Sequence, residues 1–415
     1  MQRIFLTLIA ALCVAFPAFA LDGVVIDAAT GAPLAGAHVV HDGTPLAADA
    51  QGRFHIEGMP ERVAARAPGY LRRDVAVEGA DAVLRVALRP FKPKALYLTP
   101  YGVASAELRG NALRLSEHTE INALVIDMKG DASLLPHASA AWHAAGLNEQ
   151  RPTVRDMAAL VRELKARGLY LIARVVVFKD ERLVQAHPEW AVRDASGAIW
   201  RDRERLAWID PTRREAWSLA LGVAEEAAQM GFDEIQFDYV RFPDTTGVQF
   251  AQPNTEAMRT GTIIGFIDAA RARLARYNVF IAADVFGYIC WNRDDTHIGQ
   301  QLESLAARLD YVSPMLYPSG FTFGIPGHPN PVAVPYEIVH QSLARAIERT
   351  GLPGVRFRPW LQAFRDYGFD RREFGPHEIR AQIDAAQAQG TDGWMLWNAG
   401  NHYDTDGLKP APPSP

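Results

Sequence analysis

Short apolar runs alternate with amphipathic stretches from Lys94 to near the end of the chain. In the amphipathic stretches, apolar residues recur every three or four positions, as they do on one face of a helix. The predicted helices are Val154–Arg167, Arg213–Met230, Glu256–Tyr277, Ile298–Arg308, Pro335–Thr350 and His377–Gln389. The apolar runs predict eight strands, at Ala95–Tyr101, Ala123–Lys129, Tyr170–Phe178, Glu234–Phe242, Val279–Tyr288, Tyr311–Tyr317, Phe357–Phe364 and Gly393–Asn398.

Eight strand–helix units over about 320 residues are what a (β/α)8 barrel requires. The sequence therefore predicts an α/β fold in which residues 94–410 form a TIM barrel. The alternative is a doubly wound open sheet, which would carry a glycine-rich phosphate loop after its first strand. The segment T-P-Y-G-V at residues 99–103 is not such a loop, so the barrel is favoured.

Residues 21–90 show no helical period and are divided by glycine, proline and aspartate at short intervals. This pattern is typical of a small antiparallel sandwich, so we predict an N-terminal all-β domain. Residues 90–93 (P-F-K-P) are expected to form a stiff linker to the barrel. The expected strands are Gly23–Asp27, Ala37–Val40, Arg53–Ile56, Arg72–Val77 and Ala82–Leu88.

The first twenty residues have the features of a signal peptide. Arg3 precedes an apolar run, and the small residues Ala18 and Ala20 fit the site that signal peptidase reads. We expect cleavage after Ala20, a periplasmic or secreted mature chain, and no stable membrane insertion thereafter. An uncleaved membrane anchor is the alternative. Cleavage would leave Cys290 as the one cysteine, so no internal disulfide is expected.

Composition excludes two classes of protein. The chain has 415 residues, 48% of them hydrophobic, which is far from the composition of a disordered protein. Its 43 basic residues are scattered and outnumbered by 48 acidic ones. A nucleic-acid partner would need a basic stripe, so none is expected. The motifs H-E-x-x-H and G-x-S-x-G and paired cysteines are absent, so we expect no metal and no cofactor.

In a TIM barrel, function collects at the carboxyl ends of the strands. Because side chains alternate along a strand, Asp127 is expected to share a face with Lys129, and Asp238 with Gln236. A carboxylate isolated in an apolar strand is costly unless it is paired or hydrated, so these aspartates indicate a site. The candidate site residues are Asp127, Lys129, Arg174, Gln236, Asp238, Arg241, Asp284, Tyr317, Trp360, Gln362, Trp397 and Asn398.

Asp238 and Asp284 are expected at matching depth on adjacent strands, which lie about 4.8 Å apart. Two carboxyl groups flanking a sugar bond perform glycoside hydrolysis, and a separation of about 5–5.5 Å is typical of retention of configuration. We expect Asp238 and Asp284 to lie near this separation, a little wider because aspartate replaces the longer glutamate. Asp284 should be the less solvated of the two, with Phe286 and Tyr317 beside it. Aromatic residues near the same ends (Tyr101, Tyr239, Trp291, Tyr317, Trp360, Trp397 and Tyr403) would favour sugar binding as a group.

The alternative is a network of buried ion pairs, in which Asp238 pairs with Arg174 or Arg241 and Asp127 pairs with Lys129. Arg241 follows Asp238 by three residues and is expected on the loop side of the strand. There it could hold Asp238 ionised, bind a substrate hydroxyl or carboxylate, or form a rim salt bridge to Asp244.

Several longer motifs resemble a bacterial family of glycoside hydrolase-like proteins. The motifs are G-F-D-E-I-Q-F-D-Y-V-R-F-P (231–243), A-D-V-F-G (283–287), Y-V-S-P-M-L-Y-P (311–318), R-P-W-L-Q (358–362) and D-G-W-M-L-W-N (392–398). The resemblance implies a barrel like those of α-amylase and α-galactosidase type enzymes, with Asp238 as nucleophile and Asp284 as proton donor. Amylases usually place a glutamate on strand five and an aspartate on strand seven, where this chain has Asp284 and Gln362. Asp127 is therefore the reserve acid.

The N-terminal segment G-V-V-I-D-A-A-T-G-A-P-L-A-G-A-H-V-V (23–40), with A-P-G-Y at 67–70, resembles the carboxypeptidase regulatory-like, transthyretin-like domain. That resemblance implies an accessory module. For the whole chain we expect an exported, retaining glycoside hydrolase that acts on α-linked glycans or exopolysaccharide, with an oligo- or polysaccharide as its partner. The alternative is a non-catalytic carbohydrate-binding protein on a degenerate barrel.

Overall fold

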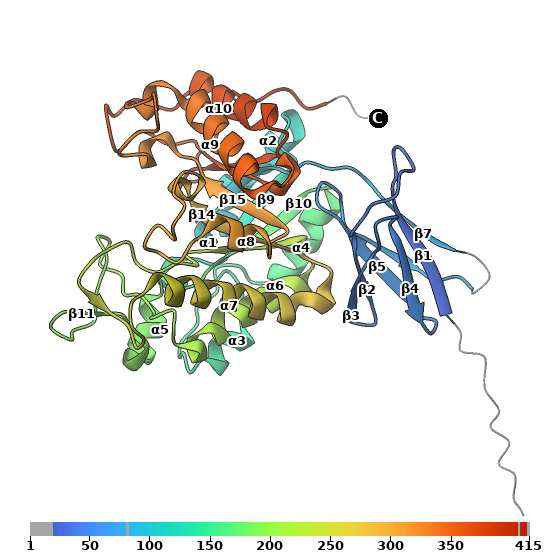
Figure 1. Ribbon diagram of the computed structural model, residues 1–415, viewed down its shortest axis with the longest axis horizontal. Helices are drawn as coiled ribbons and strands as arrows, with labels where there is room; N and C mark the ends of the chain where they lie inside the picture. Colours follow the sequence, from blue (N-terminus) through green and yellow to red (C-terminus); the bar gives the residue numbers. More distant parts are fainter. Residues whose placement is uncertain (1–19, 80–82, 406, 413–415) are drawn as a thin grey trace, which may run out of the picture.

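The computed structural model describes residues 20–79, 83–405 and 407–412. It contains a small all-β domain followed by a closed parallel barrel that helices surround (Figure 1). Residues 1–19, which make up nearly all of the predicted signal peptide, lie outside the described residues. Across the described ranges, no helix combines the length and apolar character needed to cross a membrane.

Two sheets pack together in the N-terminal domain, with strand orders β4–β1–β7 and β3–β2–β5–β6. Val25, Val39, Ile56, Val63 and Val86 are buried between them. The strands are β1 (Ala20–Asp27), β2 (His38–His41), β3 (Thr44–Ala47), β4 (Arg53–Glu57), β5 (Arg62–Arg66), β6 (Arg73–Ala76) and β7 (Leu84–Leu88).

The all-β N-terminal domain is confirmed, but two details of the prediction are wrong. The strands β3 and β5 were not predicted, because their sequences T-P-L-A and R-V-A-A-R carry few large apolar residues. The sandwich is also not purely antiparallel, since β1 and β7 pair in parallel. After β1 the chain visits the other sheet and returns as β4, antiparallel to β1. It crosses a second time through β5 and β6 and returns as β7, which runs parallel to β1.

The predicted eight-stranded barrel is confirmed. Its strands follow one another as β8–β9–β10–β12–β14–β15–β16–β17, and β17 pairs with β8 to close the sheet. All of these pairs are parallel. The closure of the sheet by β17 and β8 excludes the open-sheet alternative. The strands are β8 (Lys94–Leu98), β9 (Ala123–Lys129), β10 (Tyr170–Val176), β12 (Glu234–Asp238), β14 (Phe280–Phe286), β15 (Tyr311–Met315), β16 (Trp360–Gln362) and β17 (Trp394–Trp397), with β11 (Arg193–Asp194) and β13 (Val248–Gln249) pairing in the loops.

Helices cover the outside of the barrel. The helices α1, α2, α3 and α5 were not predicted. Helix α8 is shorter than expected because Asp295 holds residues 295–300 in a loop. Its carboxylate pairs with Arg259 at 2.6 Å and accepts N–H bonds from His297 and Gly299. The helices are α1 (Pro100–Ala104), α2 (Ala106–His118), α3 (Ala140–Ala144), α4 (Met157–Ala166), α5 (Glu181–Ala186), α6 (Trp217–Met230), α7 (Glu256–Leu274), α8 (Leu302–Ala306), α9 (Pro335–Thr350) and α10 (Pro376–Ala388).

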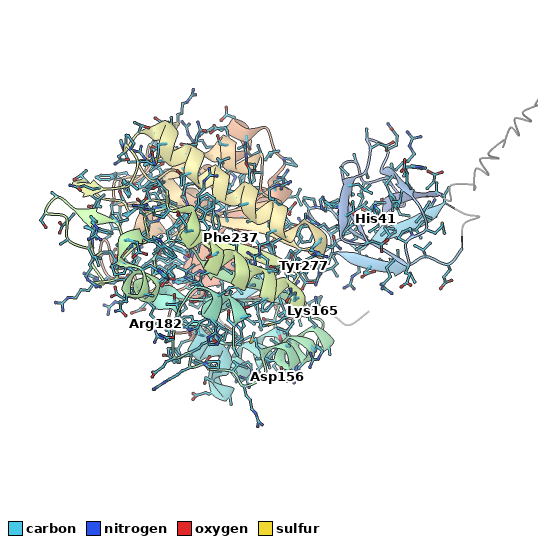
Figure 2. The ribbon with its side chains drawn as sticks, turned by 90° about the horizontal axis from the view of Figure 1, so that it is seen from below. His41, Asp156, Lys165, Arg182, Phe237 and Tyr277 are labelled. Carbon is cyan, nitrogen blue, oxygen red and sulfur yellow. The ribbon has the colours of Figure 1, made fainter. Side chains whose placement is uncertain are left out.

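The sandwich contacts the barrel at the end where the strands begin. The N–H of Gly69 donates to the hydroxyl of Tyr311, the first residue of β15, at 3.0 Å. Arg72 donates to Asp233, just before β12, at 3.1 Å. Figure 2 shows the sandwich on the side of the barrel that carries Lys165 and Tyr277. The opposite end, where the strands terminate, is left open.

A buried arginine organises the amino-terminal end of the barrel interior. Arg358 is fully buried and pairs with Glu234 at 2.5 Å and with Asp392 at 2.7 Å. Its guanidinium also lies 4.1 Å from the centre of the Tyr311 ring. Both carboxylates are themselves buried, so neither has water to replace this partner.

Replacing Arg358 by methionine should therefore destabilise the protein strongly. Removing one partner of a buried ion pair typically costs about 3–5 kcal/mol. Arg62 is the matched control, because its pair with Asp74 is more than half exposed and Arg62→Met should cost under about 1 kcal/mol. Urea unfolding of the two variants measures the difference. A similar loss in the free energy of unfolding of both variants would show that the buried cluster contributes no more to stability than an exposed ion pair.

Candidate active site

Asp238 is the last residue of β12 and faces the open end of the barrel. Its Oδ1 accepts the backbone N–H of Tyr239 at 2.5 Å. Tyr239 adopts a left-handed conformation with φ of 48°, which is uncommon for a residue with a side chain. This strained turn aims the N–H of Tyr239 at the carboxylate, and strain of this kind is typical of functional sites.

Arg174 of β10 links Asp238 to Asp127 of β9. It donates through Nε and Nη2 to Asp238 Oδ2 at 2.9 and 2.5 Å, and through Nη1 to Asp127 Oδ1 at 2.7 Å. Asp127 also accepts from the hydroxyl of Tyr97 at 2.6 Å. The expected ion pair of Asp238 with Arg174 is thus present. Burial raises the pKa of Asp127 to about 6, against the opposing effect of Arg174.

Asp284 of β14 lies at the level of Asp238 on the neighbouring strand. The parallel register pairs Gln236 with Ala282 two residues earlier on both strands. Its Oδ1 accepts the indole N–H of Trp360 at 2.6 Å, whereas its Oδ2 has no hydrogen-bond partner in the described part of the chain. Burial, and then the negative charge of Asp238, raise the pKa of Asp284 well above its ordinary value.

Asp284 is 1% exposed and Asp238 is 6% exposed, so Asp284 is the less solvated carboxyl group, as predicted. One atom, Nε of Arg174, lies 2.9 Å from Asp238 Oδ2 and 3.8 Å from Asp284 Oδ2. The two oxygens therefore cannot be further apart than the sum of these distances, about 7 Å. That limit concerns one oxygen of each group and is compatible with the retaining separation of about 5–5.5 Å between the two carboxyl groups.

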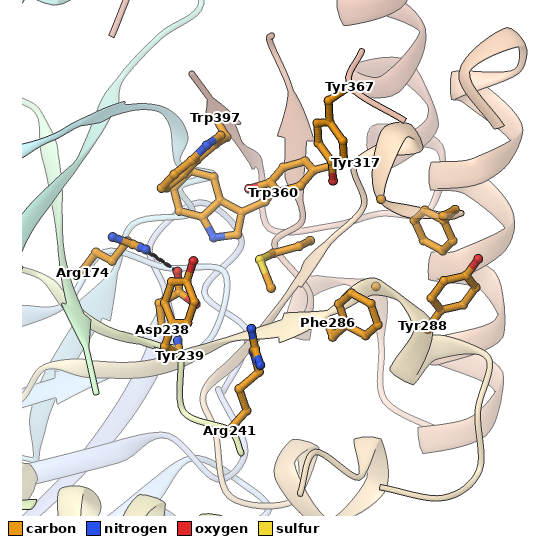
Figure 3. Close-up of a pocket in the computed structure, with 14 residues that line it drawn as sticks. Arg174, Asp238, Tyr239, Arg241, Phe286, Tyr288, Tyr317, Trp360, Tyr367 and Trp397 are labelled. Carbon is orange, nitrogen blue, oxygen red and sulfur yellow. Dashed lines mark hydrogen bonds and ion pairs between the residues drawn. The ribbon is translucent and has the colours of Figure 1, made fainter. Parts of the chain in front are cut away.

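A cavity of about 270 Å³ opens beside Asp238 at the carboxyl ends of the strands (Figure 3). Its wall is mainly aromatic, which suits the faces of sugar rings. Six candidate residues line it: Arg174, Asp238, Arg241, Tyr317, Trp360 and Trp397. The other lining residues, which were not among the candidates, are Tyr239, Phe286, Gly287, Tyr288, Met315, Gly320, Phe321 and Tyr367.

Several of the unanticipated lining residues belong to loops beyond strand ends. Tyr288 follows β14, Phe321 follows β15, and Tyr367 follows β16. Sequence pattern places strands but not the path of the loops that follow them, so these three were missed. Aromatic residues shortly after each strand would have been the available signal. Of the aromatic residues named from the sequence, three do not line the cavity: Tyr101, Trp291 and Tyr403. Tyr101 is exposed, the indole N–H of Trp291 donates to Ser342, and the hydroxyl of Tyr403 donates to the carbonyl of Tyr97 at 3.0 Å.

Neither Asp127 nor Asp284 lies on the cavity wall. Asp284 is covered by Trp360, which both lines the cavity and hydrogen-bonds the carboxylate. Phe286 and Tyr317, expected beside Asp284, do line the cavity. The sequence did not reveal that an indole would stand between this carboxyl group and the open space.

The shared face predicted for Asp127 and Lys129 is wrong. The register between β9 and β10 shifts after the pair Asp127–Arg174, so that Lys129 lies beside Val175 instead of continuing the inward face. Lys129 is buried, donates to the carbonyl of Val176 at 2.9 Å and pairs with Asp180 at 2.8 Å. The ion pair of Asp127 with Lys129 is therefore absent, and Lys129 stabilises the fold through Asp180 and the Val176 carbonyl.

Three other candidates are occupied by protein contacts away from the cavity. Gln236 is fully buried one layer below Asp238 and donates to Ser313 at 3.1 Å. Gln362 is fully buried and donates to the hydroxyl of Ser319 at 2.7 Å. Asn398 donates to the carbonyl of Ala363 at 2.7 Å. The prediction that they contact substrate does not fit these positions.

Arg241 points into the cavity from the side opposite Trp360 and Trp397 (Figure 3). Its guanidinium lies 4.8 Å from the ring centre of Trp208 and 5.3 Å from that of Tyr239. One N–H donates to the carbonyl of Phe242 at 3.0 Å. The rim salt bridge to Asp244 does not form, and Asp238 is paired by Arg174 instead.

The raised pKa of Asp284 predicts a specific pH dependence of stability. A carboxyl group whose pKa rises on folding from its ordinary 3.8 stabilises the fold at low pH, and this contribution is lost as the pH rises toward the folded-state pKa. The free energy of unfolding of the wild type, relative to Asp284→Asn, should therefore fall above about pH 4, by at most about 1.4 kcal/mol per pH unit.

Urea unfolding between about pH 4 and pH 7 measures this difference. Asp294→Asn is the control, because it removes an exposed carboxyl group from the loop after β14. A wild-type minus Asp284→Asn difference that stays constant over this range would contradict a raised pKa for Asp284.

Comparison with known proteins agrees with the barrel. Residues 95–403 match the model of a family described as "Putative glycosyl hydrolase domain". The glycoside hydrolase domain of PgaB (BpsB) from Bordetella bronchiseptica shares the fold, with 14% identity, a TM-score of 0.55, and coverage of 75% of this chain and 95% of that one. No curated protein matches the sequence.

Two further solved structures are similar in part. A hypothetical protein from Ruminiclostridium thermocellum ATCC 27405 is 35% identical, over 46% of this chain and 97% of that one, with a TM-score of 0.41. A chitinase from Chromobacterium violaceum ATCC 12472 is 14% identical, over 75% and 96% of the two chains, with a TM-score of 0.46. Because the family match spans most of the chain, this protein belongs to the glycosyl hydrolase domain family described above.

Proposed function

We propose that the protein is an exported, retaining glycoside hydrolase that cleaves α-linked glycans or an exopolysaccharide. The observation that carries the proposal is the pair of neighbouring carboxyl groups, Asp238 and Asp284. One is paired with an arginine at the cavity wall, and the other is buried with a raised pKa. A carboxyl group with a raised pKa, next to a carboxylate that an arginine pairs, suits the roles of acid and nucleophile. The α-linkage rests on the amylase-like motifs alone.

The reaction would proceed in two steps. The Asp238 carboxylate attacks the anomeric carbon while Asp284 gives its proton to the departing glycosidic oxygen. This leaves a glycosyl ester on Asp238 and a free hydroxyl on the leaving sugar. Asp284, now ionised, then takes a proton from a water that attacks the same carbon, which releases Asp238 and restores the proton. Arg174 and the N–H of Tyr239 orient the attacking carboxylate.

The aromatic wall supports a sugar substrate. Trp360 and Trp397 are perpendicular neighbours, with ring centres 5.4 Å apart, and Tyr317 lines the same cavity. Aromatic faces bind the apolar faces of pyranose rings, and the few polar groups of the wall would then fix the orientation.

One observation favours the second candidate, a non-catalytic carbohydrate-binding protein. Asp284 is 1% exposed behind Trp360, so an acid at this position reaches a glycosidic oxygen only if Trp360 or Asp284 moves. A binding protein needs the aromatic wall and neutral hydrogen-bond donors, but no proton donor. Glycan binding without hydrolysis of any glycoside would identify this second function.

Export and an accessory role for the sandwich complete the proposal. Export is supported by the sequence of residues 1–20. The accessory role is supported by the resemblance to regulatory-like domains and by the position of the sandwich at the end of the barrel away from the cavity. N-terminal sequencing of the protein from the periplasm or medium of expressing cells should give Leu21 as the first residue.

Asp238→Asn should lower kcat by about a thousand-fold or more and leave the fold intact. The amide keeps the volume of the carboxylate but removes the attacking charge. Aryl α- and β-glycosides and bacterial exopolysaccharides serve as substrates, and circular dichroism checks the fold. Asp294→Asn, which removes an exposed carboxylate outside the cavity, should retain wild-type turnover. More than a tenth of wild-type turnover in Asp238→Asn would rule out the nucleophile.

Azide rescue separates the two roles on an aryl glycoside with a good leaving group. In Asp238→Ala, azide should replace the lost nucleophile and give a glycosyl azide of inverted configuration. In Asp284→Ala, the glycosyl ester should still form and azide should intercept it, giving a product of retained configuration. Failure of azide to restore turnover in Asp284→Ala would limit Asp284 to positioning Trp360 and Arg174.

A further inference from the structure

Arg241 stands where two hollows meet. The cavity beside Asp238 and a neighbouring groove of about 530 Å³ share two wall residues, Tyr239 and Arg241. The groove continues along Trp200 and Trp208, on the loops between α5 and α6. A chain of sugars leaving the cavity on this side would therefore pass directly over Arg241.

The charge of Arg241 has no acidic partner. Among residues 20–79, 83–405 and 407–412, no carboxylate lies within ion-pair distance of it, and its one hydrogen bond goes to the carbonyl of Phe242. An arginine has five N–H donors, so most of its donor capacity remains for a ligand. Stacking on Trp208 and Tyr239 fixes the guanidinium in place, which lowers the entropy lost on binding.

The two buried cations in these walls are neutralised, and Arg201 at the rim of the groove pairs with Glu181. Arg203 also lines the groove, but its side chain is exposed. Arg174 is shared by Asp127 and Asp238. Lys179 is surrounded by Asp131, Asp202 and Glu204, at 3.2, 3.3 and 2.5 Å. Within the described residues Arg241 is thus a cation that the protein itself leaves uncompensated at the mouth of the cavity.

We propose that Arg241 binds an anionic substituent of the glycan, a uronic acid carboxylate or a sulfate ester, and that the substrate class is an acidic polysaccharide. The planar fork of a guanidinium matches the two oxygens of such a group. The inference rests on the proposed function only in that the cavity binds glycan. It adds that the sugar unit next to the bond to be cleaved, on the Trp208 side, carries the charge.

Binding by the full chain carrying Asp238→Asn tests this without turnover. The probes are oligosaccharides of equal length from polygalacturonate, a sulfated galactan, cellulose, amylose and chitosan, titrated by calorimetry. At least one acidic probe should bind at least ten-fold more tightly than both neutral probes and the cationic probe. Its affinity should fall with rising salt, as expected for an ion pair. The two acidic probes separate a carboxylate from a sulfate ligand.

Adding Arg241→Gln should reduce the affinity for that acidic probe at least ten-fold and leave the neutral probes unchanged. Arg241→Lys keeps the charge without the fork, and should lose part of the affinity. Arg182→Gln is the matched control, because Arg182 also stacks on an indole, that of Trp142 at 5.7 Å, but lines a separate hollow. Arg182 is labelled in Figure 2. This control should bind like the parent.

Several results would overturn the proposal: equal or tighter binding of neutral or cationic probes, absence of acidic binding, or acidic binding unaffected by Arg241→Gln. If Arg241→Gln does not fold, the salt dependence and Arg241→Lys decide instead. Hydrolysis of neutral glycans without acidic binding would refute this inference and keep the proposed function. Binding of an acidic probe, without hydrolysis of any probe by the wild type, would keep this inference and refute the proposed function.

Discussion

The open end of the barrel depends on one cation shared by three carboxyl groups. The guanidinium of Arg174 bonds Asp127 and Asp238 and lies 3.8 Å from Asp284, so side chains from four adjacent strands, β9, β10, β12 and β14, meet in this cluster. Three buried carboxylates cannot all ionise beside a single positive charge, because each uncompensated charge in the interior is costly. At least one of the three carboxyl groups must therefore be protonated. Burial raises the pKa of Asp127 to about 6, and burial together with the charge of Asp238 raises the pKa of Asp284 well above its ordinary value. Asp284 is also the carboxyl group furthest from Arg174.

The inward-facing polar residues of strand β12 have different roles at different depths in the barrel. These residues follow the two-residue period of a strand, and each meets a different layer of the interior. Glu234 pairs with Arg358 at the closed end, Gln236 bonds Ser313 in the middle, and Asp238 reaches the cavity. Glu234 and Gln236 are fully buried and bond to other protein groups, whereas the carboxylate of Asp238 lies on the cavity wall. Similar residues on one face of one strand therefore have different roles.

The two-residue alternation of side chains along a strand explains which parts of the fold and of the site could be predicted from the sequence. Apolar runs located all eight barrel strands, and counting along β12 and β14 placed Asp238 and Asp284 side by side. The alternation gives the wrong face where the strand register is irregular. This happens at the shift between β9 and β10, which removes Lys129 from the inward face. The alternation also cannot foresee partners supplied by distant segments. Gln362 is held by Ser319 from a loop, and Asp284 accepts a hydrogen bond from the indole of Trp360, two strands away in the barrel.

The turn at Tyr239 ties the candidate nucleophile to the candidate anion site. Its left-handed backbone directs an N–H to Asp238, and its ring forms part of both hollows. The ring is packed between cations, with Lys179 at 4.9 Å and Arg241 at 5.3 Å from its centre. Because Asp238 and Arg241 lie three residues apart on this single constrained segment, their spacing is set by the backbone rather than by flexible loops. A substrate held by Arg241 would consequently present a fixed bond to Asp238, so that recognition of charge and choice of the bond to be cleaved would be one structural property.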